Sequence, residues 1–253
     1  MAIDGETAAV ALVEAWEHLL SSTPGWWVRR TQGAVAGVTK VPLATLNGVW
    51  VSDEQIDAAA IGALLDRVAD TRVPHCLQVR PASARAAQEI ASGSGMTPDE
   101  SIPLMVLDGP GGLKEDGPRE LVVQALSPEE GSRHASLAAA GFGAPEEYFL
   151  ALLTAEVLHL PGLRTYIGEV DGELVSTGLG FAFGDAVGIF NVATPGAYRG
   201  RGYGSAITVR AIQDGFRSGA RWAWLQSSTL GLPVYERLGF RTVESWPCWI
   251  KSG

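Results

Sequence analysis

A glycine-rich turn in the C-terminal half, Arg199-Gly200-Arg201-Gly202-Tyr203-Gly204, carries the residue types with the clearest chemistry. Glycine permits positive φ angles and a close approach of the backbone to a ligand. The amphipathic helix expected after the turn offers unpaired N–H groups and a partial positive charge at its start, and such amides gathered at one point form an anion site. The ligand to expect here is a phosphate or a pyrophosphate.

The spacing of the turn excludes the two common nucleotide-binding loops. A P-loop requires Gly-Lys-Ser/Thr after the turn, and this sequence has none. A dinucleotide fingerprint G-x-G-x-x-G that begins at Gly200 requires glycine where Ser205 stands, and one that begins at Gly202 requires glycine where Ile207 stands. The phosphate ligand is therefore of another kind.

The spacing that does match is Arg/Gln-x-x-Gly-x-Gly/Ala, present as Arg199-x-x-Gly202-x-Gly204, and in it the chain resembles the GNAT superfamily of N-acetyltransferases. Residues 225–240 resemble the strand, short helix and Tyr-x-x-x-Gly-Phe ending of that family, and the resemblance covers about Arg119 to Lys251. It implies an acyl-CoA-dependent N-acyltransferase that moves an acetyl or other short acyl group to a primary amine by direct attack in a ternary complex.

The resemblance also implies roles for individual residues. Backbone groups of Val192 to Thr194 would bond the pantetheine arm like an added strand, and one amide there would face the thioester carbonyl. The turn would hold the pyrophosphate, Ser228 would lie near the pantetheine, and Tyr235 takes the position of the usual general acid. The implied cofactor-binding residues are Val192, Ala193, Thr194, Arg199, Gly200, Arg201, Gly202, Tyr203, Gly204, Ser205 and Ser228.

The general base of this reaction is not assigned by the sequence. The glutamate that some family members carry before the cofactor loop aligns with Ala186, beside Asp185. Glu156 and His159 lie three apart on one helix face, and Glu146 and Glu147 stand at a helix start, but surface or capping roles explain each of these side chains better.

Metal and hydrolase chemistry have little support. Glu156-Val-Leu-His159 has the spacing of carboxylate-bridged metal sites, but those sites need a second copy and further carboxylates. We therefore predict no metal. Neither a Gly-x-Ser-x-Gly elbow nor a Cys/His nucleophile pattern occurs.

The amino-acid composition limits the kinds of partner that the protein is expected to bind. A net charge of −9 and a pI near 5.0 argue against nucleic acid, which needs a concentrated basic face, and suit a small cationic or neutral substrate. Together with the family resemblance, this implies a small-molecule amine as the acceptor. No apolar run reaches the roughly 18 residues that span a bilayer, and the N-terminal residues carry acids where a secretory signal carries basic groups. We expect a cytoplasmic protein without a membrane partner, as monomer or homodimer, with Cys76 and Cys248 as buried apolar residues.

The order of elements predicts an α/β (α+β) fold of two GNAT-like units, each a mixed, mostly antiparallel twisted sheet flanked by helices. Four glycines and two prolines within Leu107 to Pro118 indicate a boundary. The predicted domains are 1–108, a linker at 109–118, and 119–253. The predicted strands are 26–31, 43–51, 76–79, 102–107, 120–126, 164–170, 173–183, 186–194, 222–227 and 240–249. Asp171-Gly172, between two of these strands, predicts a two-residue hairpin turn. The predicted helices are 7–21, 53–69, 84–91, 128–159 with a break at 141–145, one ending near 217, and 233–238.

The N-terminal half is interpreted as a degenerate partner domain. It has the strand and helix order of a GNAT-like unit but lacks Arg/Gln-x-x-Gly-x-Gly, and Gly93-Ser94-Gly95 ends a helix instead of following a strand. One acyl-CoA site per chain is therefore expected. The alternative function is a non-catalytic acyl-CoA-binding or sensing module that keeps the loop without turnover.

Overall fold

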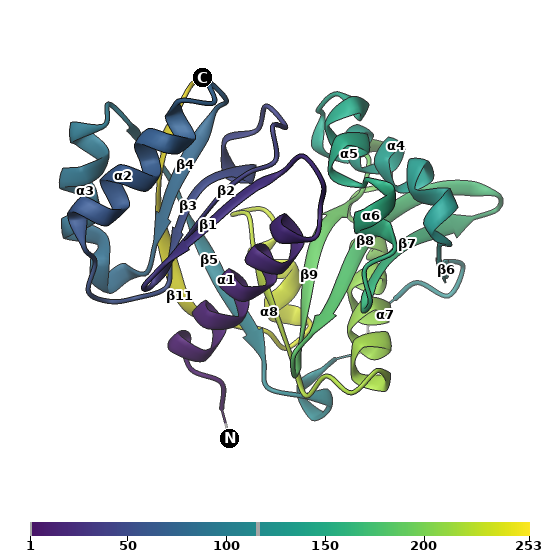
Figure 1. Cartoon of the computed structure of the whole chain (residues 1–253). Coiled ribbons are helices and arrows are strands. Elements are labelled where there is room, and N and C mark those ends of the chain that lie inside the picture. Colours follow the sequence, from purple (N-terminus) through teal and green to yellow (C-terminus); the bar gives the residue numbers. More distant parts are fainter. Residues whose placement is uncertain (1, 115–116) are drawn as a thin grey trace. The chain divides into compact units, whose positions relative to one another are not determined.

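The computed structural model describes residues 2–114 and 117–253, which divide into two compact units (Figure 1). Unit 1 takes in Met105–Arg241 together with the N-terminal residues up to Ile3, and unit 2 takes in Asp4–Leu104 and Thr242–Gly253. Both are mixed α/β with mostly antiparallel strands, so the predicted fold class is confirmed.

The bounds of these units differ from the predicted domains 1–108 and 119–253. The segment predicted as a linker, 109–118, belongs to unit 1, and its residues 115 and 116 lie outside the described residues. The last strand, β11 (Arg241–Lys251), belongs almost entirely to unit 2, where it pairs antiparallel with β4 (His75–Val79). Pairing between segments so far apart leaves no local sequence signal.

Unit 2 places helices on both faces of a sheet ordered β1-β2-β3-β4-β11, in which β3 and β4 run parallel. Strand β5 gives its first residues to unit 2 and its last three to unit 1. The other elements of unit 2 are α1 (Gly5–Ser21), β1 (Trp27–Thr31), β2 (Ala34–Val38), β3 (Asn47–Val51), α2 (Ala58–Ala69), α3 (Ala84–Gly93) and β5 (Thr97–Leu107). The sequence predicted these except β2, a short run of small residues that is buried throughout.

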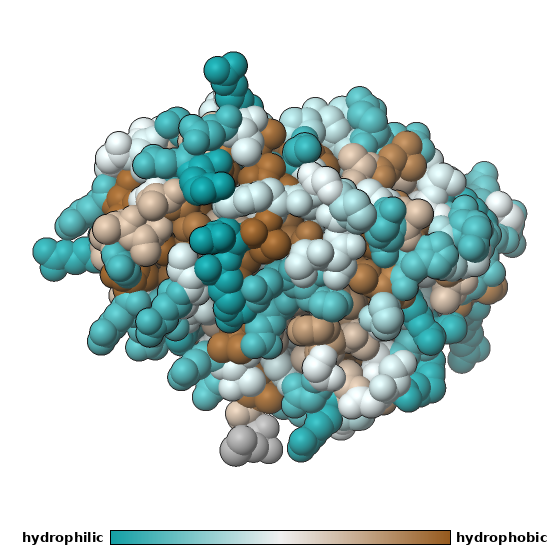
Figure 2. Space-filling model, viewed as in Figure 1, coloured by the Kyte–Doolittle hydropathy of each residue, from teal (hydrophilic) through white to brown (hydrophobic). Residues whose placement is uncertain are grey.

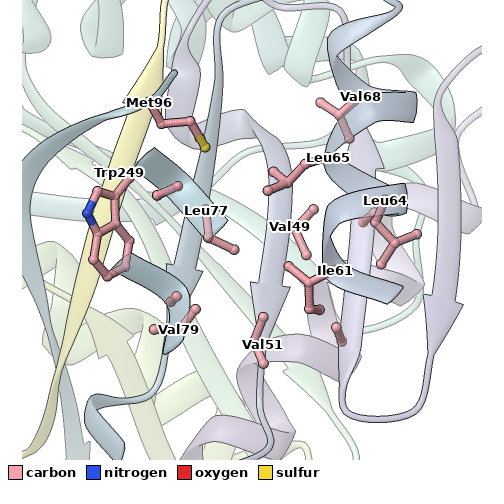
Figure 3. Packing of buried hydrophobic residues seen from close by; sticks show 14 of the residues in the cluster. Val49, Val51, Ile61, Leu64, Leu65, Val68, Leu77, Val79, Met96 and Trp249 are labelled. Atoms are coloured by element: carbon pink, nitrogen blue, oxygen red, sulfur yellow. The ribbon is translucent and has the colours of Figure 1, made fainter. Parts of the chain in front are cut away.

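The core of unit 2 lies between the sheet and α2 (Figure 3). Ile61, Leu64 and Leu65 of α2 belong to one cluster with residues of β3 and β4, and Trp249 of β11 joins it. On the other face of the sheet, Trp16 of α1 stacks on Trp50 of β3, with ring centroids 5.1 Å apart. Since Trp249 is 4% exposed, burial as well as pairing places the last strand in unit 2.

The two cysteines, distant in sequence, lie on paired strands of unit 2. The register sets Cys248 opposite Gln78, two residues along β4 from Cys76. Both thiols are free and buried, as the sequence predicted. A hydrogen bond with Cys248 and burial raise the pKa of Cys76, so its reactive thiolate form is disfavoured.

Asn47 at the start of β3 is completely buried and holds three segments of unit 2 together. Its carbonyl oxygen accepts hydrogen bonds from the Thr39 amide at 2.9 Å and from the Lys40 amide at 3.1 Å. Its amide nitrogen donates to the carbonyl oxygens of Val41, Leu43 and Pro74 at 2.8, 3.0 and 3.0 Å. An amide is the one side-chain group that both accepts and donates in this way without a charge.

Replacing Asn47 with aspartate should lower the free energy of unfolding by about 3 kcal/mol or more. The carboxylate keeps the acceptor but loses the donor, and its second oxygen then faces three carbonyl oxygens in a buried place. Urea unfolding of wild type and variant at pH 7 measures the difference. A loss below about 1 kcal/mol would show that the network contributes little to stability.

Unit 1 is built on a sheet ordered β10-β9-β8-β7-β6, antiparallel except for the β9–β10 pair. The turn between β7 and β8 is the predicted hairpin, with φ of 50° at Asp171 and 84° at Gly172. The elements are β6 (Val122–Ala125), α4 (Gly131–Phe142), α5 (Glu146–Leu152), α6 (Ala155–Leu158), β7 (Leu163–Val170), β8 (Glu173–Phe183), β9 (Ala186–Ala193), α7 (Tyr203–Arg217), β10 (Trp222–Gln226) and α8 (Leu232–Arg237).

Helix α7 covers one face of this sheet and α4 the other (Figure 1). The buried face of α7 includes Ile207 and Ile212, which belong to the core cluster of unit 1, and Ile207 lies next to Gly178 of β8. A buried carboxylate also fixes this helix: Asp214 accepts a hydrogen bond from the Tyr166 hydroxyl of β7 at 3.1 Å and from Arg210 Nε at 3.2 Å. The C-terminal part of α7 is thus fixed relative to β7.

Helix α4 carries a buried histidine, His134, that is 0% exposed. The Thr177 hydroxyl donates to the Tyr166 carbonyl at 2.7 Å, so it accepts from Nδ1–H of His134, also at 2.7 Å. Nε2 of His134 has no hydrogen-bond partner among the described residues. Burial lowers the pKa of His134 from 6.5 to about 4, so the ring is neutral at pH 7.

The free energy of unfolding should therefore decrease as the pH is lowered from 6.5 to 4, the range between the two pKa values of His134. Between pH 6.5 and 4 the unfolded chain binds a proton at His134 that the folded chain does not, so this contribution is complete above pH 6.5 and is lost as the pH falls. We expect wild type to lose about 2 kcal/mol more than His134→Asn between pH 7 and pH 5. Urea unfolding at both pH values measures this, and equal losses would contradict the assignment.

Hydrophilic side chains cover much of the face shown in Figure 2, between smaller hydrophobic areas. Among the described residues, the exposed large hydrophobic side chains of unit 1 are Val122, Phe142, Leu150 and Leu230. In that described part, no helix combines the length and the apolar character required to cross a membrane.

Candidate functional site

The site is formed where strands β9 and β10 separate. Their parallel register runs from Ala186–Trp222 to Gly188–Trp224, whereas β9 continues to Ala193 and β10 to Gln226. At the point of separation the Phe190 ring packs edge-on against Trp224, with centroids 5.3 Å apart. The edge of β9 beyond Gly188 therefore lacks a strand partner on this side among the described residues. Such an edge binds an extended ligand through its backbone groups.

A β-bulge shapes the end of β9. Between the pairs Thr177–Ala193 and Leu179–Phe190, β8 advances by two residues and β9 by three. Asn191, within this stretch of β9, has a φ of 49°. A bulge bends its strand and redirects the residues beside it. The sequence analysis did not find Asn191; the available signal was that asparagine tolerates positive φ better than most residues.

The predicted residues Val192, Ala193 and Thr194 follow the bulge. The hydroxyl of Ser176 on β8 donates to the Ala193 carbonyl at 3.0 Å and lies 2.9 Å from the Thr194 hydroxyl. Since the Ser176 proton is used in the first bond, Thr194 donates in the second. Ser176, which the sequence analysis missed, thus fixes the end of the strand.

The glycine-rich turn bends sharply into α7. Gly200 has a φ of 77°, and Gly202, the N-cap residue, has a φ of 81°, values that favour glycine. The six backbone amides of 200–205 have no hydrogen-bond acceptor within the described ranges. They include the first amides of α7, where the helix dipole also favours negative charge. This arrangement fits a phosphate group, as the glycine spacing predicted.

The turn and the strand end face one another. A Cβ atom built on Gly204 would lie 3.4 Å from Thr194 Oγ1 and 3.5 Å from Val192 Cγ1. The side chains of Tyr203 and Ser205 are buried. The guanidinium of Arg201 makes one long hydrogen bond to the described residues, 3.4 Å to the Ala197 carbonyl. An anion held by the amides would thus lie near the free edge of β9.

Tyr235 on α8 packs against the core cluster that also supports Val192. Its ring meets Phe240 edge-on at a centroid distance of 6.0 Å, and its hydroxyl has no hydrogen-bond partner in the described part of the chain. Burial raises the pKa of Tyr235 to about 12, so the phenol is protonated at neutral pH and has a proton to donate.

Ser228 lies in the turn before α8. Its hydroxyl accepts from the Gly231 amide at 3.2 Å, and its carbonyl accepts from the Gly231 and Leu232 amides at 3.0 and 3.1 Å. The side chain thus caps the turn. Within the described ranges, no hydrogen bond joins Ser228 to Thr194 or to the glycine-rich turn.

The candidate bases lie apart from the end of β9 or on the surface. Asp185 precedes the first residue of β9, about 20 Å of extended strand from Val192, and accepts from Trp222 Nε1 at 3.0 Å. Glu156 and His159 are exposed, and His159 Nδ1 donates to the Ala155 carbonyl at 2.7 Å. The described residues contain no group of three or more His, Cys, Asp or Glu side chains suited to a metal ion.

The fold and the site define a protein in which backbone amides suited to an anion lie beside a strand edge that has no partner among the described residues. Residues 133–240 match the model of the acetyltransferase (GNAT) family. This part of the chain is therefore a GNAT domain, which confirms the resemblance seen in the sequence, and acyl transfer is the general activity of that family. No functionally curated protein matches the chain.

Solved structures share the fold. A GCN5-related N-acetyltransferase from Kribbella flavida is 19% identical with a TM-score of 0.71, over 100% of this chain and 97% of that one. A GCN5-related N-acetyltransferase from Sphaerobacter thermophilus is 18% identical with a TM-score of 0.61, over 96% and 91% of the two chains. A functionally unknown conserved protein from Staphylococcus epidermidis is 12% identical with a TM-score of 0.66, over 89% and 93%. These likenesses support the same fold over most of the chain.

Proposed function

We propose that the chain is an acyl-CoA-dependent N-acyltransferase that moves an acetyl or other short acyl group to a primary amine. The observation that carries this proposal is the row of six amides at 200–205, which have no acceptor among the described residues, beside the edge of β9 that lacks a strand partner there. Coenzyme A combines the two chemistries that these features suit, a pyrophosphate for the amides and an extended amide-containing arm for the strand edge.

Acyl-CoA is a co-substrate in this proposal, and the reaction is a direct transfer. The neutral amine attacks the thioester carbonyl, the C–N bond forms, the C–S bond breaks, and the thiolate takes a proton. A backbone amide near Val192 stabilises the oxyanion, and Tyr235 donates the proton. The proton that the amine loses passes to a base or to solvent, and no residue is assigned to it.

A second candidate is a non-catalytic acyl-CoA-binding module. The unassigned base is the observation that favours it, whereas the protonated and unpartnered Tyr235 favours the enzyme. Thiol release from acetyl-CoA, measured against a panel of small primary amines, separates the two. Amine-dependent release supports the enzyme, and tight CoA binding without release across the panel supports the module.

One chain should bind one acyl-CoA. In unit 2 the parallel strands β3 and β4 remain paired to their last residues, Val51 and Val79, so no free edge opens between them. The Asp57 carboxylate accepts from the first amides of α2, those of Ala59 and Ala60, at 3.0 and 3.1 Å. A phosphate there would meet a negative charge in place of free donors.

Calorimetric titration of the full chain with acetyl-CoA measures this stoichiometry, and we expect a value near one. A value near two would contradict the asymmetry between the units. As a matched control, Asp57→Asn should leave the value at one, because the pairing of β3 with β4 still closes the strand edge.

A further inference from the structure

Arg199, the first residue of the glycine-rich motif, uses its guanidinium to join two backbone segments. Nε donates to the Thr194 carbonyl at 3.0 Å, and Nη2 donates to the Gly141 carbonyl at 2.6 Å. Thr194 follows the last residue of β9, and Gly141 lies in the last turn of α4. Carbonyl groups in the last turn of a helix lack partners within the helix, so the second bond also satisfies the end of α4.

The edge of the guanidinium that carries Nε and Nη2 is one that would hold an anion with two parallel bonds. In this structure both of its donors bind carbonyl groups, and a phosphate would have to displace both bonds to reach that edge. The nearby Arg201 differs, because its guanidinium makes a single long hydrogen bond, at 3.4 Å, within the part of the chain that the structure describes. The two arginines of the turn therefore have different surroundings.

Direct packing also holds the end of α4 against the end of β9. A Cβ atom on Gly141 would lie 2.7 Å from Ala193 Cβ and 3.0 Å from the Thr194 nitrogen. Only a residue without a side chain lets α4 approach the strand end this closely. The residues that lie together here, Ala193 and Thr194, are those proposed to bind the pantetheine arm.

We propose that Arg199 is a positioning residue, which holds the end of β9 against the end of α4 and does not bind the pyrophosphate. This inference rests on the proposed function for its effect on catalysis. Arg199 then acts on the pantetheine-binding residues through the Thr194 carbonyl. Arg201, which makes only the long Ala197 bond among the described residues, is the arginine of the turn that we expect to meet phosphate.

Two acyl donors test this assignment: acetyl-CoA, and S-acetyl-pantetheine, which lacks the phosphates. Arg199→Gln should lower kcat/KM by about tenfold or more with both donors, and by a similar factor. Arg199→Lys should lose as much, because an ammonium keeps the charge but cannot bridge both carbonyls in the fixed geometry. Arg201→Gln should lower kcat/KM with acetyl-CoA only.

The phosphate-ligand alternative gives a different pattern. If Arg199→Gln impaired acetyl-CoA alone and Arg199→Lys restored most of the activity, Arg199 would be a phosphate ligand and the proposal would be wrong. Gly141→Ala should reproduce the loss with both donors, because its Cβ pushes the helix from the strand end. Gly62→Ala, where a Cβ meets nothing within 4 Å, is the matched control and should have wild-type activity.

Hydrogen exchange in the free protein tests the connection without acyl-CoA. The amides of Gly143 and Ala144 both donate to the Ala139 carbonyl at the end of α4. In Arg199→Gln and Arg199→Lys they should exchange about tenfold faster than in wild type, while the amides of β10 keep their rates. Unchanged exchange at the end of α4 would overturn the proposal. A wild-type protein that binds no CoA, with faster exchange in the variants, would refute the proposed function and leave the structural connection intact.

Discussion

Gly204→Asp should abolish CoA binding while leaving the fold largely intact. The Cβ of the new residue has room, because its nearest neighbours would be Thr194 Oγ1 at 3.4 Å and Val192 Cγ1 at 3.5 Å. The carboxylate would then lie between the free amides and the strand end, where the pyrophosphate is proposed to bind. Two like charges about 4 Å apart near a protein surface repel by about 4 kcal/mol, which is roughly a thousandfold in affinity.

Three variants separate charge from size in this prediction. Gly204→Asn fills nearly the same volume without a charge and should retain much more affinity than Gly204→Asp. Gly93→Asp places the same carboxylate at the end of α3, where a Cβ meets nothing within 4 Å, and should leave binding unchanged. Titration with CoA and thermal unfolding are measured together. A folded Gly204→Asp protein with wild-type affinity would mean that the turn does not hold the phosphates.

Local sequence patterns predicted the elements around this turn well. Alternate glycines before an amphipathic segment predicted a bend into a helix, and the positive φ of Gly200 and Gly202 agrees with that prediction. The Asp171-Gly172 hairpin and the end of α3 near Gly93 followed from turn chemistry in the same way. In each case neighbouring residues determine the conformation.

The features that the sequence did not reveal depend on distant contacts. The bulge at Asn191 exists because two residues of β9, Asn191 and Val192, lie against one residue of β8, Gly178, and neither strand alone shows that register. The place of β11 in unit 2 depends on pairing with β4 and on burial of Trp249. The sequence predicted a break between helices at 141–145, whereas Gly141 still belongs to α4. Its close approach to Ala193 is a tertiary contact, which the local sequence does not show.

Tyr235→Phe should lower kcat by on the order of 10²- to 10⁴-fold, the usual contribution of a general acid, while CoA affinity changes little. The thiolate that leaves has a conjugate acid near pH 8 to 9, and the pKa of Tyr235, raised to about 12 by burial, keeps the phenol protonated until well above that. The hydroxyl makes no hydrogen bond to another described residue, and the ring contact with Phe240 survives in the variant.

The same variant separates a catalytic tyrosine from a tyrosine that only packs. If Tyr235 only packs, Tyr235→Phe keeps its rate per folded molecule and changes the melting temperature at most slightly. Tyr148→Phe on α5, outside the proposed machinery, is the matched control and should keep the wild-type kcat. The measurement is kcat with an accepted amine, beside CoA affinity and melting temperature, for all three proteins. An unchanged kcat in Tyr235→Phe would remove Tyr235 from the reaction and leave solvent to protonate the thiolate.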